Sequence, residues 1–197
     1  MEACPGVKQI IEVMLNKNYK VFKNSKGHDL NIVGIRTSSI DANTFNDWIA
    51  VFYSFDNNWN FFTFPATTDP GTYWRSKPMN VDGTAIMKPG QYRGAYMIGR
   101  HKKYKALQQK SAITVYRDAN RDTHLDTVGV EEQTGIYAIN IHRSGESQAS
   151  RIVNKWSAGC QVFQDPDHFK FFLTLCEKAR AKFGNSFTYT LLREEDF

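Results

Sequence analysis

Hydrophobic positions recur at helical spacing near both ends of the chain. Residues 167–183 predict a helix that Asp165 or Asp167 can cap at its start and Gly184 can end. The side chains expected on its buried face are Phe169, Phe172, Leu173, Cys176 and Phe183. Residues 7–18 predict a shorter amphipathic helix that packs on a core. Its apolar face comprises Val7, Ile10, Ile11, Met14 and Leu15.

Between these helices, runs of β-branched and aromatic residues predict strands. The first three predicted strands cover 30–36, 48–55 and 59–64, and Asp56-Asn57-Asn58 is the expected hairpin loop. Residues 65–110 combine many prolines and glycines with large aromatic side chains, which favours long ordered loops between short strands. The remaining predicted strands cover 112–117, 135–142, 159–163 and 187–192.

These elements predict one strand-dominated α+β domain over residues 1–197, with a helix near each end. A chain of this length can bury a core without disulfides or structural metal. Its composition, 41% hydrophobic and 23% charged, excludes intrinsic disorder. Residues 1–47 supply the N-terminal helix and first strand, and residues 164–197 supply the C-terminal helix and last strand.

Charge and hydropathy narrow the classes of partner. The formal net charge of +5 favours an anionic polymer, but the basic residues are spread along the chain, so we expect no nucleic-acid partner. No apolar run is long enough to span a membrane, so we expect no membrane insertion. The first residues lack the pattern of a secretory signal. We therefore expect synthesis as a soluble cytoplasmic protein without a signal peptide.

The strongest candidate chemistry lies between His142 and Cys160. Alternation along the predicted strand 135–142 places His142 at a strand end and on the face opposite Ile141. Small residues precede Cys160, so a tight turn can leave its thiol accessible and aim backbone N–H groups at one point. A cysteine nucleophile needs a histidine partner and donors for an oxyanion. Asn140, Ser144 or a backbone carbonyl could orient His142.

The spacing His142, 14 intervening residues, then Ser157-Ala158-Gly159-Cys160 resembles the signature of the L,D-transpeptidase (YkuD-type) catalytic domain. The upstream stretch Thr67-Thr68-Asp69-Pro70-Gly71-Thr72-Tyr73 resembles a second motif of that family. The resemblance covers residues 48–163 and implies a β-sandwich or barrel. It also implies that Cys160 is the nucleophile, His142 the base, and the backbone of Ala158, Gly159 and Cys160 the oxyanion hole.

The resemblance further implies a peptidoglycan substrate and no required cofactor. Cys160 would form a thioester with a stem peptide, and water would then release it, as in an endolysin of a phage. Such an enzyme acts on the periplasmic or extracellular cell wall after delivery by another route. The chain departs from the family pattern at Ala158, Arg143 and Gln161, which affects substrate choice. Residues expected near the substrate are Arg143, Ser144, Trp156, Ser157, Gln161, Tyr73 and Trp74.

Three other functions remain open at this stage. Within the family, an amine could resolve the thioester, which would make the protein a transpeptidase that forms cross-links. The departures from the motif are also compatible with a catalytically inactive cell-wall-binding module. Finally, a thiol protease of ordinary proteins would keep the cysteine and histidine and change only the substrate.

One loop has the alternating oxygen spacing of a calcium site. Its candidate ligands are Asp118, Asn120, Asp122, His124 and Asp126. The alternative is a solvated acidic turn, because Thr123 replaces the usual glycine and no helix clearly flanks the loop. Three further histidines, His28, His101 and His168, have no metal-ligand spacing and are expected on the surface.

Overall fold

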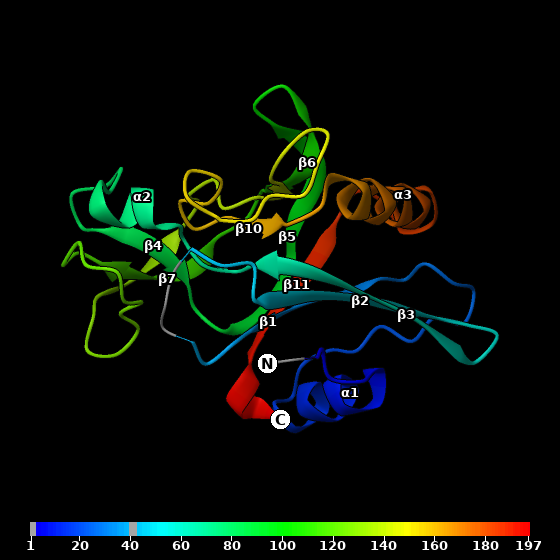
Figure 1. Cartoon of the computed structure of the whole chain (residues 1–197). Helices are drawn as coiled ribbons and strands as arrows, with labels where there is room; N and C mark the ends of the chain where they lie inside the picture. The colour runs from blue at the N-terminus through cyan, green and yellow to red at the C-terminus, as the bar shows by residue number, and fades with distance from the viewer. Residues whose placement is uncertain (1–2, 40–42) are drawn as a thin grey trace.

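Eight strands close a barrel in the computed structural model, which describes residues 3–39 and 43–197 (Figure 1). Their order around the barrel is β1-β11-β5-β6-β9-β10-β3-β2. The pairs β1–β11 and β9–β10 are parallel, and the others are antiparallel. The barrel strands are β1 (Asn31–Arg36), β2 (Asp47–Phe55), β3 (Asn58–Thr67), β5 (Gly90–His101), β6 (Tyr104–Gln109), β9 (Ile141–Arg143), β10 (Gln161–Phe163) and β11 (Phe187–Arg193).

A three-stranded sheet in the order β4-β7-β8 accompanies the barrel. Its strands are β4 (Thr84–Met87), β7 (Ile113–Asp118) and β8 (Glu132–Gly135). The helices of the described residues are α1 (Val7–Asn16), α2 (Thr72–Ser76), α3 (Pro166–Phe183) and a short 3-10 turn, η1 (Glu194–Asp196). The strand-dominated α+β class with a helix near each end is therefore confirmed. None of the described helices is long and apolar enough to cross a membrane.

Both long helices form where the sequence predicts them. The Asp165 carboxylate accepts a hydrogen bond from the Asp167 amide at 2.8 Å and caps α3, and Gly184 ends the helix with a φ of +86°. Phe169, Phe172 and Cys176 are buried as expected, but Leu175 and Ala179 complete the buried face. Of the other two residues expected on this face, Phe183 is 41% exposed and Leu173 is half-buried.

The predicted hairpin after residues 48–55 is also present. Asp56 and Asn57 have φ values of +50° and +62° between β2 and β3. A two-residue turn with two positive φ values matches the right-handed twist of the strands that it joins. Asp and Asn tolerate this conformation better than most side chains, which explains why the local sequence was sufficient to predict the turn.

Two predictions for the middle of the chain are wrong. Residues 65–110 contain the twelve-residue strand β5 and its partner β6 rather than short strands alone. The predicted strand 135–142 is not continuous, because β8 ends at Gly135 and β9 begins at Ile141. Between them, the side-chain oxygen of Gln109 accepts hydrogen bonds from the amides of Tyr137 and Ile139, at 3.1 and 3.0 Å. A side chain thus takes the place of a neighbouring strand.

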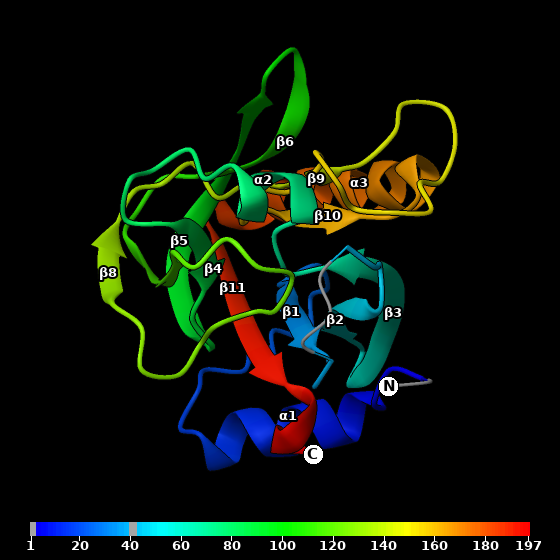
Figure 2. The same cartoon turned by 60° about the vertical axis from the view of Figure 1, so that its left-hand side comes forward.

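Strands β1 and β2 are buried on both faces because a separate hydrophobic cluster covers each. Ile32 and Val51 belong to the cluster that contains most of the core, including residues of α3. Val33 and Phe52, on the opposite faces of the same strands, pack with α1. Figures 1 and 2 show α1 at the end of the molecule opposite the β5–β6 hairpin. Strands from residues 1–47, 48–163 and 164–197 thus contribute to one barrel.

The interior of the barrel supports the turn that carries Cys160. Gly34 lies against Tyr189, since a Cβ atom at residue 34 would come within 1.8 Å of the Tyr189 hydroxyl. That hydroxyl donates to the side-chain oxygen of Gln161 at 2.8 Å. The side-chain nitrogen of Gln161 in turn donates to the carbonyl of Gly159 at 3.1 Å. All four residues are buried, so the position of residue 159 depends on the packing of β1 against β11.

We predict that Gly34→Ala destabilises the protein by about 1–3 kcal/mol, because the added methyl group displaces the Tyr189 ring. Urea denaturation measures the change. Gly90→Ala on β5 is the matched control, because its Cβ atom would meet nothing nearer than 3.6 Å. Equal stability of the two variants would contradict the tight packing of Tyr189 on Gly34.

Candidate functional site

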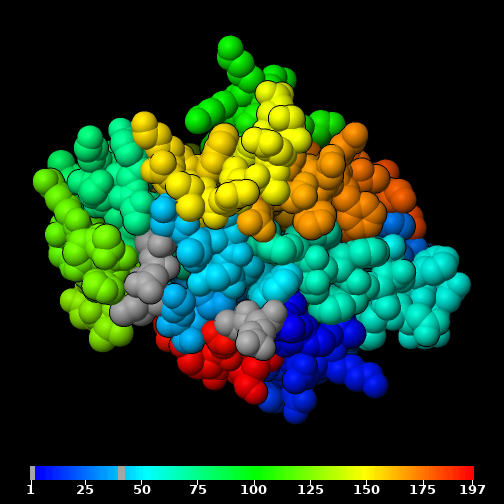
Figure 3. Space-filling model, viewed as in Figure 1, coloured from blue at the N-terminus to red at the C-terminus, as the bar shows by residue number. Residues whose placement is uncertain are grey.

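The parallel pair β9–β10 brings the predicted histidine and cysteine together. In this pair Gln161 is opposite Ile141, and Val162 is opposite His142. The Asn140 amide contacts Cys160 Sγ at 3.4 Å. The connection between the two strands crosses the upper face between the α2 region and α3, where Figure 3 shows it in yellow. A pairing between distant residues therefore creates the site.

A backbone carbonyl orients the His142 ring. His142 Nδ1 lies 2.7 Å from the carbonyl oxygen of Arg143 and 3.1 Å from the hydroxyl of Tyr104. A carbonyl can only accept, so the ring donates its Nδ1 hydrogen and keeps the lone pair on Nε2. Nε2 is buried and has no hydrogen-bond partner among the described residues. The imidazole is thus held in the tautomer that can take a proton at Nε2.

A second histidine, His101, packs against His142. The two rings are stacked with centroids 3.9 Å apart and an interplanar angle of 13°. The Asn140 side-chain oxygen accepts from the Gln109 amide at 2.9 Å, so its NH₂ group faces His101 Nδ1 at 3.2 Å. His101 Nδ1 therefore accepts a hydrogen bond and carries no proton. This contact fixes the ring that covers His142.

Ligand atoms of His101, His142 and Cys160 lie within 4.8 Å of one another. Lone pairs of imidazole nitrogens lie in the ring plane, so two nearly parallel stacked rings direct them side by side rather than toward one point. His101 Nδ1 is also occupied by the hydrogen bond from Asn140. The arrangement suits an acid–base pair better than a metal centre.

Burial keeps both reactive groups of the pair uncharged. Cys160 is 9% exposed and His142 is 1% exposed. Desolvation raises the pKa of the Cys160 thiol to about 11. Desolvation, with a further contribution from the neighbouring His101, lowers the pKa of His142 to about 3. At neutral pH the pair is a thiol beside a neutral imidazole, which suits proton transfer during attack rather than a preformed thiolate.

The turn before Cys160 offers two amides to an oxyanion. Gly159 has a φ of +121°, and a Cβ atom there would come within 2.5 Å of the Ala85 carbonyl. The Gly159 amide donates to Ser157 Oγ at 3.1 Å, and this hydroxyl donates to the Cys160 carbonyl at 2.8 Å. The amides of Ala158 and Cys160 have no hydrogen-bond partner within the described part of the chain. Of the predicted oxyanion-hole backbone, these two amides are therefore free.

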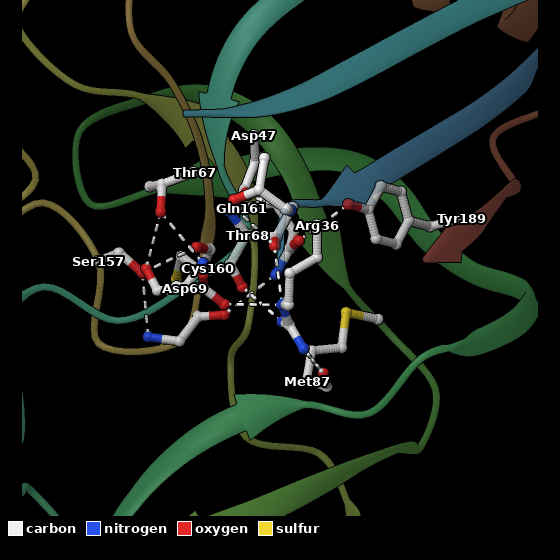
Figure 4. Close-up of polar contacts among 12 residues, drawn as sticks. Arg36, Asp47, Thr67, Thr68, Asp69, Met87, Ser157, Cys160, Gln161 and Tyr189 are labelled. Carbon is white, nitrogen blue, oxygen red and sulfur yellow. Dashed lines mark hydrogen bonds and ion pairs between the residues drawn. The ribbon is translucent and has the colours of Figure 1, made fainter. Parts of the chain in front are cut away.

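The upstream motif at residues 67–73 lies directly beside this turn. The Gly71 amide donates to the Ser157 carbonyl at 2.9 Å. Within the motif, Asp69 pairs with Arg36 Nε at 2.7 Å, and Figure 4 shows this pair next to Ser157 and Cys160. Burial raises the pKa of Asp69 to about 7, which the Arg36 charge opposes. The two motifs that carry the family resemblance thus form one region of the structure.

Three of the seven residues expected near a substrate are buried supports. The Ser144 hydroxyl donates to the Gln164 carbonyl at 2.7 Å, and Ser144 is 1% exposed. Ser157 holds the turn as described above, and Gln161 points into the barrel toward Tyr189. These side chains are therefore placed to position the backbone rather than to meet a solvent-borne substrate.

The other four lie nearer to the surface. The Arg143 guanidinium lies 4.3 Å from the centroid of the Tyr104 ring. Trp156 is 42% exposed, and Trp74 donates from its indole nitrogen to the Lys155 carbonyl at 3.0 Å. Tyr73 packs edge-on against Trp74 with centroids 4.9 Å apart. These side chains remain candidates for contact with a substrate.

In the predicted calcium loop, an arginine pairs with two of the candidate ligands. Arg75 Nη2 pairs with Asp118 at 2.8 Å and with Asp122 at 3.4 Å. The Asn120 side-chain nitrogen donates hydrogen bonds to the carboxylates of both Asp122 and Asp126. His124 is bound through its amide to Asp122. In the described chain, no three Asp and His side chains of this loop bring ligand atoms within 4.8 Å of one another.

Sequence reasoning missed two members of the site. His101 was expected on the surface, but it is half-buried against His142. Tyr104 received no role, although its hydroxyl contacts both His142 Nδ1 and the Arg143 carbonyl. Both residues lie at the β5–β6 turn, which becomes a neighbour of β9 only when the barrel closes. No local spacing signals this contact.

We predict that the Cys160 thiol ionises with a midpoint near pH 11, because burial opposes its charged form. The measurement is the ultraviolet thiolate absorbance of the wild type minus that of Cys160→Ala across an alkaline titration. The subtraction removes the contributions of Cys4 and Cys176. A midpoint near neutral pH that rises in His142→Ala would instead indicate a thiolate–imidazolium pair.

The comparisons with known proteins leave the geometry as the basis for any functional proposal. No protein-family model, curated protein or solved structure matches this chain. The resemblance to L,D-transpeptidases therefore depends on the two motifs and on the arrangement of residues that they produce. The structure brings those motifs together around Cys160 and His142.

Proposed function

We propose that the protein is a cysteine-dependent peptidoglycan hydrolase that cuts L,D-peptide bonds of stem peptides or their cross-links. The observation that carries the proposal is the oriented pair of His142 and Cys160. Its imidazole donates through Nδ1 to the Arg143 carbonyl and holds a free Nε2 lone pair. Acyl transfer through a thiol needs such a base, together with oxyanion donors and room for a carbonyl.

In the first step, Cys160 Sγ attacks the carbonyl carbon of the L-centred residue while its proton passes to His142 Nε2. The carbonyl electron pair moves onto oxygen, where the free amides of Ala158 and Cys160 can donate hydrogen bonds. As the tetrahedral intermediate collapses, the imidazolium gives its proton to the departing amine. The D-residue leaves, and the remaining peptide is bound to Cys160 as a thioester.

In the second step, water attacks the thioester. His142 takes a proton from the water, and the new bond to oxygen forms as the carbon–sulfur bond breaks. The proton then returns to Sγ, which restores the thiol and releases a carboxylic acid. No metal ion takes part in this sequence.

Two cavities near the pair support a peptide substrate. One, of about 510 Å³, is lined by Tyr104 and Arg143 on the His142 side and by residues of α3. The other, of about 140 Å³, is lined by Trp74 and Ala158 on the Cys160 side. Each cavity is bordered by a residue close in sequence to one member of the pair, which suits a substrate with chain on either side of the scissile bond.

The proposal predicts that purified sacculi incubated with the wild type lose cross-linked dimers or terminal D-residues, as measured by mass spectrometry of the released muropeptides. Cys160→Ala removes the nucleophile and His142→Ala removes the base, so each should lower the rate by about 10,000-fold or more. Cys4→Ala is the matched control, because Cys4 packs in the separate hydrophobic cluster beneath α1.

Other product patterns would contradict hydrolysis. New cross-links formed only by proteins that retain Cys160 would indicate transpeptidation. Identical muropeptides from the wild type and Cys160→Ala, with both proteins pelleting with sacculi, would indicate a binding module. Cleavage of an ordinary protein without any change in the sacculi would indicate a general thiol protease.

A further inference from the structure

The cavity on the Cys160 side holds a buried arginine. Its volume is about 140 Å³, and its walls include Trp74, Gly83, Ala85, Arg117, Tyr137 and Ala158. Arg117 comes from β7 in the small sheet, and Ala85 comes from its neighbour β4. The small sheet therefore lines a cavity that Ala158, in the turn before the proposed nucleophile, also lines.

The Arg117 guanidinium is fixed in place without a carboxylate. Its Nε donates to the side-chain oxygen of Gln133 at 2.7 Å, and its Nη1 lies 3.4 Å from the Gly83 carbonyl. The face of the group lies over Tyr137, 4.7 Å from the ring centroid. The carboxylates of Asp82 and Glu131 contact the amide of Gln133. No described acid forms an ion pair with Arg117.

This environment differs from that of the other buried arginines. Arg36 pairs with Asp69 at 2.7 Å, and Arg75 pairs with Asp118 at 2.8 Å. Arg117 is equally buried, at 5% exposed. A buried cation without an anion is costly unless something supplies the missing charge. An anion from outside the described chain would satisfy this requirement.

Part of the guanidinium remains available to such an anion. Arg117 Nη2 has no hydrogen-bond partner among the described residues, and it is not sealed from solvent. With Nε and Nη1 anchored, the remaining N–H groups are oriented before any ligand arrives. A planar carboxylate matches this arrangement.

We infer that Arg117 binds a carboxylate of the peptide substrate next to the scissile bond. This inference rests on the proposed function, because it assigns the recognition of that substrate to a named residue. Two carboxylates of a stem peptide have the required chemistry. One is the α-carboxylate of the D-residue that is released, and the other is the side-chain carboxylate that some diamino acids carry.

The cavity borders the turn that carries Cys160. Ala158, in its wall, lies two residues before Cys160 and supplies one of the two free amides. Cys160 Sγ lies 3.6 Å from the carbonyl oxygen of Ala138, the residue that follows Tyr137 of the same wall. The cavity that contains Arg117 is thus bordered on two sides of the sequence by residues close to Cys160, namely Ala158 and Tyr137.

The test compares a synthetic stem tetrapeptide in three forms: both carboxylates free, the C-terminal carboxylate amidated, and the side-chain carboxylate amidated. For the wild type, amidation of the recognised carboxylate should lower kcat/KM by roughly 10- to 100-fold. Arg117→Met should lower kcat/KM for the free acid by a similar factor and lose the distinction between acid and amide. Arg117→Lys should keep part of the distinction between acid and amide.

Arg93→Met is the control for general loss of positive charge, because Arg93 is exposed on β5. It should behave as the wild type does. Equal cleavage of all three peptides by the wild type would overturn the inference. So would an equal loss on all three peptides in Arg117→Met, because that result indicates a structural role alone.

A binding measurement separates this inference from the proposed function. If the wild type cleaves none of the peptides, Cys160→Ala is titrated with the same three forms by calorimetry. Weaker binding of one amidated form than of the free acid would support the carboxylate site, provided that the double variant Cys160→Ala, Arg117→Met shows no such difference. This result would stand although the proposed reaction had failed. Equal binding of acid and amides, or no binding of any form, would overturn the inference.

Discussion

The parallel pairing of β9 with β10 is the constraint on which the candidate site depends. Each strand has only three residues, and Val162 lies opposite His142 in their register. Parallel neighbours cannot be joined by a tight hairpin, so the chain must make a long connection between them. The separation of His142 and Cys160 in the sequence is that connection. Neighbouring residues, His101 and Tyr104 among them, then cover His142 and help to remove the pair from water.

Burial determines what kind of chemistry this pair can perform. An ion pair of thiolate and imidazolium would need solvation or opposite charges nearby, and desolvation dominates at both groups. The stacked ring of His101 disfavours a charge on His142 further. The arrangement therefore keeps the proton on sulfur in the resting state. Orientation of the base by the Arg143 carbonyl then matters more than charge in the resting state.

Sequence patterns correctly predicted the features that depend on residues adjacent in the chain. The turn at Asp56-Asn57 and the cap at Asp165 follow from the residues themselves. The segment 135–142 has the alternation of a strand, but the Gln109 side chain occupies its amides, and only the folded barrel brings Gln109 there. His101 was missed for the same reason. The motifs located the candidate cysteine and histidine, whereas their surroundings are set by contacts between distant residues.

The departures from the family motif spare the chemical groups because backbone atoms supply most of them. Any residue at position 143 offers the carbonyl that orients His142, so the arginine side chain there is free to pack on Tyr104. At position 161, burial inside the barrel favours a neutral amide, since a guanidinium would need an anion there and Gln161 instead bonds to Tyr189. Ala158 keeps its amide free, and its small side chain leaves open the cavity that contains Arg117. The three departures from the motif thus leave His142, the Cys160 thiol and the two free amides in place. Those at positions 143 and 158 change cavity walls, whereas the one at position 161 changes the barrel interior.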